Sequence, residues 1–304
     1  MESIRSTKNL TRYAWLSIAA AVLTISLKLG AYWLTNSVGL LSDALESVVN
    51  LVTAIVALIA LSIAARPADE EFAFGYSKVE FFSSGFEGGM IMVAAGAIAA
   101  TAIPRLIHPQ PIEQVGLGLG ISVLASLINL GVSRILAQAG RRYGSITLEA
   151  DAAHLMTDVW TTAGVIAGVA LVAITGWQRL DALIALAVAV NIVVTGFRLL
   201  RRSALGLMDA TLPAADVETI ESVLQPHQAQ GISFHAVRTR TAAARGFVSM
   251  HVLVPGDWSV RHAHEVAERI EAELRAKLPQ IAIFTHVEPL GDPLSMQDKE
   301  IEQE

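Results

Sequence analysis

The sequence predicts an α-helical membrane protein with six transmembrane helices, followed by a C-terminal cytosolic α+β domain. Hydrophobic residues make up 53% of its 304 residues and charged residues 16%, a balance typical of chains that cross a membrane several times. After Arg202 the hydropathy falls, and the spacing of apolar residues becomes that of amphipathic helices and strands. The chain is therefore expected to have a membrane part and a soluble part.

Six apolar segments are long enough to cross the hydrocarbon core of a bilayer, which takes about 20 helical residues. They cover residues 13–34, 38–64, 82–103, 114–138, 147–175 and 180–202. The first is expected to be a span and not a cleaved signal, because no small-residue cleavage site follows a short apolar core. An even number of spans places both termini on the same side of the membrane.

Lysine and arginine gather at one side of these spans. That side holds Arg5, Lys8, Arg12, Arg66, Lys78, Arg134, Arg141, Arg142, Arg198, Arg201 and Arg202, and the other holds Arg105 and Arg179. Because cytoplasmic loops carry the excess of basic residues, we expect a multi-pass protein of the inner (plasma) membrane with both termini in the cytoplasm. The net charge of −6 hides this split and indicates no nucleic-acid partner.

The soluble part is expected to form a small domain of α-β-β-α-β order. Its expected elements are a helix at 214–224, strands at 232–241 and 247–254 joined by a turn, a helix at 260–278 and a strand at 281–287. The expected domains are a transmembrane domain, 1–208, a cytosolic domain, 209–293, and a polar, disordered tail, 294–304.

Two matching strings of polar residues interrupt the apolar spans. They are Asp43, Glu46 and Asn50 in the second span and Asp151, His154 and Asp158 in the fifth. Spacings of three and four place each string on one helical face. Ionisable groups at bilayer depth are costly, so by default they mark a substrate, ion or proton path.

Asn50 and Asp158 both fall near mid-membrane, about 12 and 11 residues from the ends of their spans at 1.5 Å per residue. If the two helices touch, the deeper residues form one four-ligand metal site, with Asp43 toward the outer mouth of a hydrated path and Asp151 toward the inner mouth. The expected ligands are Glu46, Asn50, His154 and Asp158. A single buried amide such as Asn50 is also often interhelical glue, and that alternative stays open.

The chain has no cysteine, so any metal is held by nitrogen and oxygen ligands. Such a set suits Zn²⁺ first and also Fe²⁺, Cd²⁺, Co²⁺ or Mn²⁺. Metal must displace protons from His154 and the carboxylates, which makes proton antiport a natural consequence.

The soluble domain carries histidines of its own. His235 and His251 lie on neighbouring predicted strands, His286 and Glu288 on one face of the last strand, and His264 in the second helix. A surface position would explain any one of them, but their number in one small domain favours a cytosolic metal-sensing site.

Five stretches resemble the cation diffusion facilitator (cation efflux) family, in particular its bacterial zinc or iron exporters, and the resemblance extends from about Leu10 to Pro293. They are SVGLLSDALESVVN, ARPADEEFAFGYSKVEFF, LEADAAHLMTDVWT, LDALIALAVA and LMDATLP. The resemblance implies a homodimer, a ferredoxin-like cytosolic domain similar to metallochaperones, and export of divalent metal in exchange for protons.

By position, the resemblance assigns three groups of residues in this chain. It implies an intramembrane site at Glu46, Asn50, His154 and Asp158, a cytosolic binuclear site at His235, His251, His264, His286 and Glu288, and a charged pair between spans and soluble domain at Lys78 and Asp209.

Three features depart from the family pattern. The pair in the second span is usually two carboxylates, or His with Asp, and here Asn50 replaces the second acid. Glu288 stands where an Asp is common. A loop site built in some members from one Asp and two His keeps Asp69, but Phe72 and Tyr76 replace the imidazoles. No metal is expected in that loop.

The predicted function is thus a proton-coupled exporter of divalent metal, Zn²⁺ or Fe²⁺-like ions. The alternative, which Asn50 keeps open, is a non-transporting, metal-responsive paralogue that regulates or scaffolds a partner exporter. An enzyme is not expected, because no span carries a His-Glu-x-x-His motif or a nucleophile paired with a base.

Overall fold

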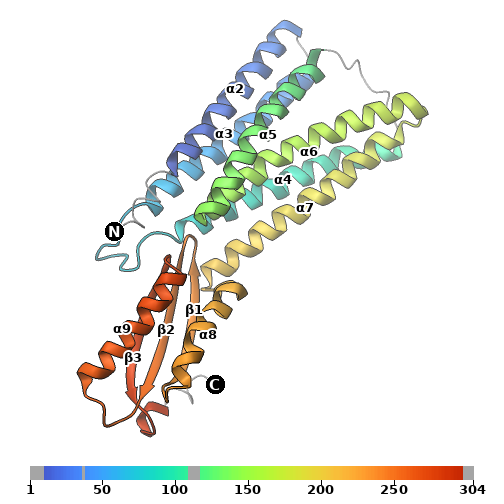
Figure 1. Cartoon of the computed structure of the whole chain (residues 1–304). Coiled ribbons are helices and arrows are strands. Elements are labelled where there is room, and N and C mark those ends of the chain that lie inside the picture. The colour runs from blue at the N-terminus through green and yellow to red at the C-terminus, as the bar shows by residue number, and fades with distance from the viewer. Residues whose placement is uncertain (1–9, 36–37, 109–116, 297–304) are drawn as a thin grey trace. The chain divides into compact units, whose positions relative to one another are not determined.

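The computed structural model describes residues 10–35, 38–108 and 117–296. The chain forms two compact units, Met1–Ala204 and Leu205–Glu304 (Figure 1).

Within the described residues, six helices of the first unit are long and apolar enough to cross a membrane, which confirms the predicted six spans. They are α2 (Thr11–Thr35), α3 (Val38–Ala64), α4 (Val79–Ile107), α5 (Leu117–Tyr143), α6 (Ile146–Thr175) and α7 (Arg179–Leu207). Several helices extend beyond the predicted spans, because hydropathy marks only the apolar length while helical hydrogen bonding continues into the polar ends. α5, for example, continues through Arg141 and Arg142.

Helix α6 is the central element of this unit, since it packs against α3, α4 and α5. It begins after Ser145, whose hydroxyl accepts a hydrogen bond from the backbone N–H of Leu148, and it ends at Gly176, whose φ of 70° is left-handed. The buried residues of α6 include Asp151 and His154. The polar string of the fifth span therefore faces other helices, as its cost in lipid requires.

Helices α4 and α7 approach each other closely through two glycines. A Cβ at Gly88 would lie 3.2 Å from the Gly196 carbonyl oxygen, and a Cβ at Gly196 would lie 3.1 Å from the Gly88 carbonyl oxygen. Small residues at such a crossing let helix backbones pack in van der Waals contact, which drives helix association in membranes.

Gly88→Ala is expected to destabilise the membrane unit by about 1–3 kcal/mol, because the added methyl group must be fitted against the backbone of α7. Its neighbour Gly89 is the matched control, since a Cβ there meets nothing within 4 Å. Thermal unfolding in detergent measures both variants. Equal stability of Gly88→Ala and Gly89→Ala would contradict the close packing.

The second unit confirms the predicted α-β-β-α-β order. Its elements are α8 (Ala214–Gln228), β1 (Ser233–Ala242), β2 (Arg245–Val254), α9 (Val260–Lys277) and β3 (Ile281–Pro289). The sheet has the order β1-β2-β3, with β2 antiparallel to β1 and parallel to β3. The parallel pair needs a crossover connection, which α9 supplies.

Helices α8 and α9 cover one face of this sheet (Figure 1). Val248, Met250 and Val252 of β2 pack there against Ile220 of α8 and Ile270 of α9. Because successive strand residues point to opposite faces, the alternate residues of β2, which include His251, lie on the other face. The candidate ligands of the strands thus stand on the side away from the helices.

Two of the differences from the predicted boundaries of this unit involve tertiary contacts. α8 continues past Pro226 to Gln228, and the buried His227 ring, whose Nε2 lies 3.0 Å from Glu273 Oε2, fixes the extra turn. The predicted disordered tail begins with a 3-10 helix, Leu294–Met296, in which the Ser295 hydroxyl donates to the Pro289 carbonyl. The remainder of that tail, 297–304, lies outside the described residues.

Candidate metal centres

Three of the four predicted intramembrane ligands form one hydrogen-bonded cluster between α3 and α6. The Asn50 Nδ2 donates to Asp158 Oδ2 at 2.5 Å, and the Asn50 Oδ1 lies 2.8 Å from the His154 Nε2. Since the Asn50 amide uses its nitrogen on Asp158, its oxygen accepts, and the His154 Nε2 must carry the hydrogen. Asn50 and His154 are 3% and 4% exposed, whereas Asp158 is only partly buried.

The other members of the second-span string lie on the same helix. Asp43 and Glu46 belong to α3, but their side chains fall outside the described part of the structure. Glu46 precedes Asn50 by one helical turn, the spacing that places both on one face. Its membership of the cluster, like the position of Asp43 on a path, stays a prediction.

Asp151 lies one turn before His154 and is 1% exposed. The Ser17 hydroxyl of α2 donates to its Oδ1 at 3.1 Å, while its Oδ2 has no hydrogen-bond partner among the described residues. Glu87 of α4 is fully buried, neither of its carboxyl oxygens has a hydrogen-bond partner in the same described part, and it interacts electrostatically with Asp151. A second group of acids thus lies beside the cluster.

One member of the cluster was missed by the sequence analysis. Asn129 of α5 donates from its Nδ2 to Asp158 Oδ2 at 3.0 Å, and the Ser126 hydroxyl donates to the Asp158 carbonyl at 3.4 Å. Ser133, one turn further along, donates to the Ala152 carbonyl at 2.7 Å. These three residues recur at helical spacing inside an apolar span, and that polar stripe was the available signal.

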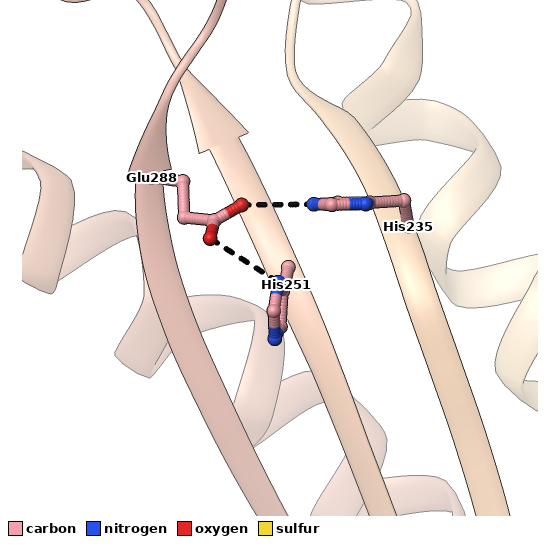
Figure 2. Close-up of side chains that lie close together, drawn as sticks. All are labelled: His235, His251 and Glu288. Carbon is pink, nitrogen blue, oxygen red and sulfur yellow. Dashed lines mark hydrogen bonds and ion pairs between the residues drawn. The ribbon is translucent and has the colours of Figure 1, made fainter. Parts of the chain in front are cut away.

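In the soluble unit, three predicted ligands from three strands meet on the open face of the sheet. Figure 2 shows Glu288 of β3 between His235 of β1 and His251 of β2. The His235 Nε2 lies 2.8 Å from Glu288 Oε2, and the His251 Nδ1 lies 3.3 Å from Glu288 Oε1. One ligand atom from each residue lies within 4.8 Å of the other two. Two imidazoles and a carboxylate, with a fourth position open, fit a Zn²⁺ ion.

A β-bulge places His235 in this cluster. The strand register pairs His235 with His251 but Arg238 with Ser249, so two residues of β1 oppose Met250 alone. Ala236, inside the bulge, has a φ of 49°. In a regular strand, His235 and Arg238 would lie on opposite faces, because they are three residues apart. The bulge turns His235 onto the face of His251, as bulges beside functional sites often do.

The two remaining predicted ligands lie outside this three-residue group. The His286 Nε2 lies 3.7 Å from Glu288 Oε1, and its side chain is 70% exposed, so His286 stands at the edge. His264 lies exposed on α9, and in the described part of one chain it joins no group of ligand atoms with the other four. The five-residue binuclear site therefore stays a prediction.

In the loop between α3 and α4, Asp69 is occupied by hydrogen bonds. The Tyr76 hydroxyl donates to Asp69 Oδ2 at 2.5 Å, and the backbone N–H groups of Phe72 and Glu71 donate to Oδ1 at 2.8 and 3.1 Å. The Tyr76 bond is the main cause that lowers the pKa of Asp69, and the same bond raises the pKa of Tyr76. The Asp69 carboxylate therefore stabilises the loop through hydrogen bonds. Phe72 and Tyr76 occupy the positions at which a metal site in this loop would have histidines.

The predicted charged pair is divided between the two units. Lys78 lies at the N-terminus of α4. Asp209 has a left-handed φ of 57°, and its Oδ1 accepts a hydrogen bond from Arg240 of β1 at 3.2 Å. Asp209 thus holds the start of the soluble unit to its sheet, and a pairing with Lys78 stays a prediction.

Six apolar helices that enclose a cluster of amide, imidazole and carboxylate groups are typical of a membrane transporter. A small α+β domain with candidate metal ligands follows them. Residues 14–208 match the cation efflux transmembrane domain, and residues 212–290 match the cytoplasmic domain of cation efflux proteins. The chain belongs to the cation diffusion facilitator (cation efflux) family, whose members export metal cations.

A relative from Synechocystis supports this membership over most of the chain. An uncharacterized transporter of Synechocystis sp. is 52% identical over 285 residues, which cover 94% of this chain and 92% of the relative. The cation-efflux pump FieF of Salmonella arizonae is 27% identical over 294 residues, 96% of each chain. The metal-bound C-terminal domain of the CzcD transporter from Thermotoga maritima is 29% identical over 27% of this chain and 99% of that one, with a TM-score of 0.24.

The geometry of the centre on the sheet predicts which histidine contributes to Zn²⁺ affinity. In an Asp158→Ala background, which is expected to lack the intramembrane site, His251→Ala should weaken the remaining Zn²⁺ binding at least tenfold, or about 1.4 kcal/mol, since one of three ligands is lost. His264→Ala is the control and should change the affinity little. Isothermal titration calorimetry measures both, and a larger loss for His264→Ala would contradict this geometry.

The loop makes a second prediction. Because the Asp69 carboxylate is engaged by Tyr76 and the backbone, Asp69→Ala should leave the number of bound Zn²⁺ ions per chain unchanged. Equilibrium dialysis with elemental analysis measures that number. A loss of one ion per chain would show that the loop binds metal.

Proposed function

We propose that this chain exports divalent metal from the cytoplasm in exchange for protons, with Zn²⁺ as the first candidate substrate. The observation that carries the proposal is the convergence of Asn50, His154 and Asp158 of two spans in one hydrogen-bonded cluster. Helix packing alone is a poor explanation for three polar side chains at one place, because burying each of them in the membrane costs free energy. Their residue types are those that hold Zn²⁺ and similar ions.

The distances in the cluster favour ligation with small adjustments. In a tetrahedral site with bonds of 2.0–2.1 Å, neighbouring ligand atoms lie about 3.3 Å apart. The His154 Nε2 and Asn50 Oδ1 lie 2.8 Å apart, so a separation of a few tenths of an ångström would let both face one ion. With Glu46 as the fourth ligand, the site would hold two formal negative charges against the two positive charges of the metal.

Proton exchange would come from an imidazolium or a protonated carboxyl group, which must lose its proton before it can bind metal. A neutral His154 could bind an ion at Nε2 once its hydrogen had moved to Nδ1, which has no hydrogen-bond partner among the described residues, and that shift would release no net proton. Asp151 and Glu87, which lie beside the cluster with carboxyl oxygens unpartnered among the described residues, are candidate acceptors that could carry the proton along the path. Asp43 would serve the outer mouth.

The remaining parts of the proposal concern assembly and placement. We infer a homodimer in the inner membrane with both termini in the cytoplasm, supported by the family of the soluble unit and by the basic residues at one side of the spans. The centre of His235, His251 and Glu288 would then sense cytosolic metal, outside the transport path. Lys78 and Asp209 would link the two units.

Asp158→Ala is expected to reduce metal transport to background, because it removes the charged ligand to which two side-chain amides are bound. Thr157→Ala is the matched control, since the Thr157 hydroxyl donates only to the carbonyl of Ala153 in its own helix. Zn²⁺ uptake and internal pH are followed together in proteoliposomes. Undiminished uptake by Asp158→Ala would contradict the site.

The alternative function, a non-transporting regulator of a partner exporter, is favoured by one observation. The amide of Asn50 is satisfied on both sides by His154 and Asp158, as in a structural contact that never opens. The same proteoliposome assay separates the two functions, since a regulator would bind metal in its cytosolic domain without moving metal or protons.

Asn50→Asp tests the contribution of this amide. A carboxylate there adds a charged ligand and a titratable group, so Zn²⁺ binding should tighten about tenfold, equivalent to 1.4 kcal/mol. Transport should become steeper in pH by about one proton per metal ion. Rates and affinities for Zn²⁺ and Mn²⁺ across pH measure both effects. Unchanged profiles would mean that Asn50 is interhelical glue.

A further inference from the structure

Asn129 of α5 is built into the cluster around Asp158 although no metal-site assignment includes it. Its Nδ2 lies 3.0 Å from Asp158 Oδ2, the same oxygen to which Asn50 donates. Helix α5 therefore contributes a side chain to the cluster, in addition to those of α3 and α6. Because the amides of Asn50 and Asn129 both donate to Asp158 Oδ2, they limit which oxygen of Asp158 can bind an ion.

A packing role explains Asn129 poorly. The residue is 4% exposed, and its Oδ1 has no hydrogen-bond partner within the described part of the chain. A buried amide oxygen without a partner is costly, whereas an apolar side chain of the same size would pack there without that cost. The single polar contact that the side chain makes to a predicted ligand is the feature that offsets this cost.

An oxygen that accepts two N–H donors is poorly placed to bind a cation as well, because both donors would point their hydrogens toward the metal. Asp158 would then ligate through Oδ1 alone. One-oxygen ligation keeps the coordination number low, as in the tetrahedral sites of Zn²⁺. Ions that prefer six oxygen-rich ligands, such as Mn²⁺, gain more from a carboxylate that can offer both oxygens.

We propose that Asn129 is a positioning residue of the transport site, which holds Asp158 for one-oxygen ligation and so favours Zn²⁺ over Mn²⁺. This inference rests on the proposed transport function and adds to it the residue that sets ion preference. Asn50 cannot fill this role alone, since its own oxygen is expected to turn from His154 to the metal. Asn129 sits on a third helix and keeps its donor in place while the ligands rearrange.

The test compares Zn²⁺ and Mn²⁺ uptake by the full-length protein in proteoliposomes. Asn129→Leu has nearly the size of asparagine but no donor, and Asn129→Ser is a second variant whose hydroxyl is too short to reach. Loss of a group that orients a metal ligand usually costs about 10–100-fold in affinity or activity. We expect the Zn²⁺/Mn²⁺ ratio of uptake efficiency to fall at least tenfold in both variants, and Asn129→Gln, which retains an amide donor, to recover part of it.

Ser133→Ala is the matched control on the same face of α5. The Ser133 hydroxyl donates to the backbone carbonyl of Ala152, so its loss removes an α5–α6 contact without touching a ligand. It should leave the Zn²⁺/Mn²⁺ ratio unchanged. An unchanged ratio in Asn129→Leu and Asn129→Ser, or an equal loss for both ions, would overturn the inference and leave Asn129 as interhelical glue.

Asp158→Ala separates this inference from the proposed function. If Asp158→Ala is inactive while the Asn129 variants keep the wild-type ratio, the transport site stands and only the role of Asn129 fails. If Asp158→Ala still transports metal, the site itself is wrong and both proposals fall.

Discussion

The constraint that shapes this molecule is the cost of polar groups inside apolar helices. In hydrocarbon, an ionisable side chain without a partner is unfavourable by several kcal/mol, roughly +2.5–3.5 on insertion scales. The chain meets this constraint by placing Asn50, His154 and Asp158 on facing helices where they satisfy one another. The same groups that hold these helices together are those suited to bind a metal, so in the proposed function packing and transport would use one set of atoms.

This double use implies competition. A metal that enters the cluster must replace hydrogen bonds that already satisfy its ligands, and the hydrogen on the His154 Nε2 must move elsewhere, for example to the Nδ1 of the same ring. The carboxyl groups of Asp151 and Glu87 differ, because they are buried with oxygens that have no hydrogen-bond partner in the described residues. The proposed exchange of metal for protons would connect a satisfied cluster with acids of this kind. The centre of the soluble unit lies on a sheet face, outside the spans, as the proposed sensing role requires.

Much of the architecture could be predicted because its signals are local. The length of each apolar run identified the spans α2 to α7, and the change of period after Arg202 identified the α-β-β-α-β unit. The spacing of three and four placed Asp151, His154 and Asp158 on one face of α6 before any contact was known. Helix ends were less predictable, as at Pro226, because a tertiary contact between His227 and Glu273 extends α8 where local propensity would end it.

The sequence by itself determined which residue types stand at which depth and on which helical face, since helical and strand periodicity are properties of the local chain. Only the tertiary structure decided which of them meet. Asn129 joins Asp158 because α5 packs on α6, and a polar residue in a neighbouring span carries no mark of its partner. His235 meets His251 and Glu288 because a bulge at Ala236 reverses the strand's alternation. His264 was predicted as a ligand on the same grounds as the other histidines. It lies on α9, which packs against the opposite face of the sheet, and is therefore separated from them.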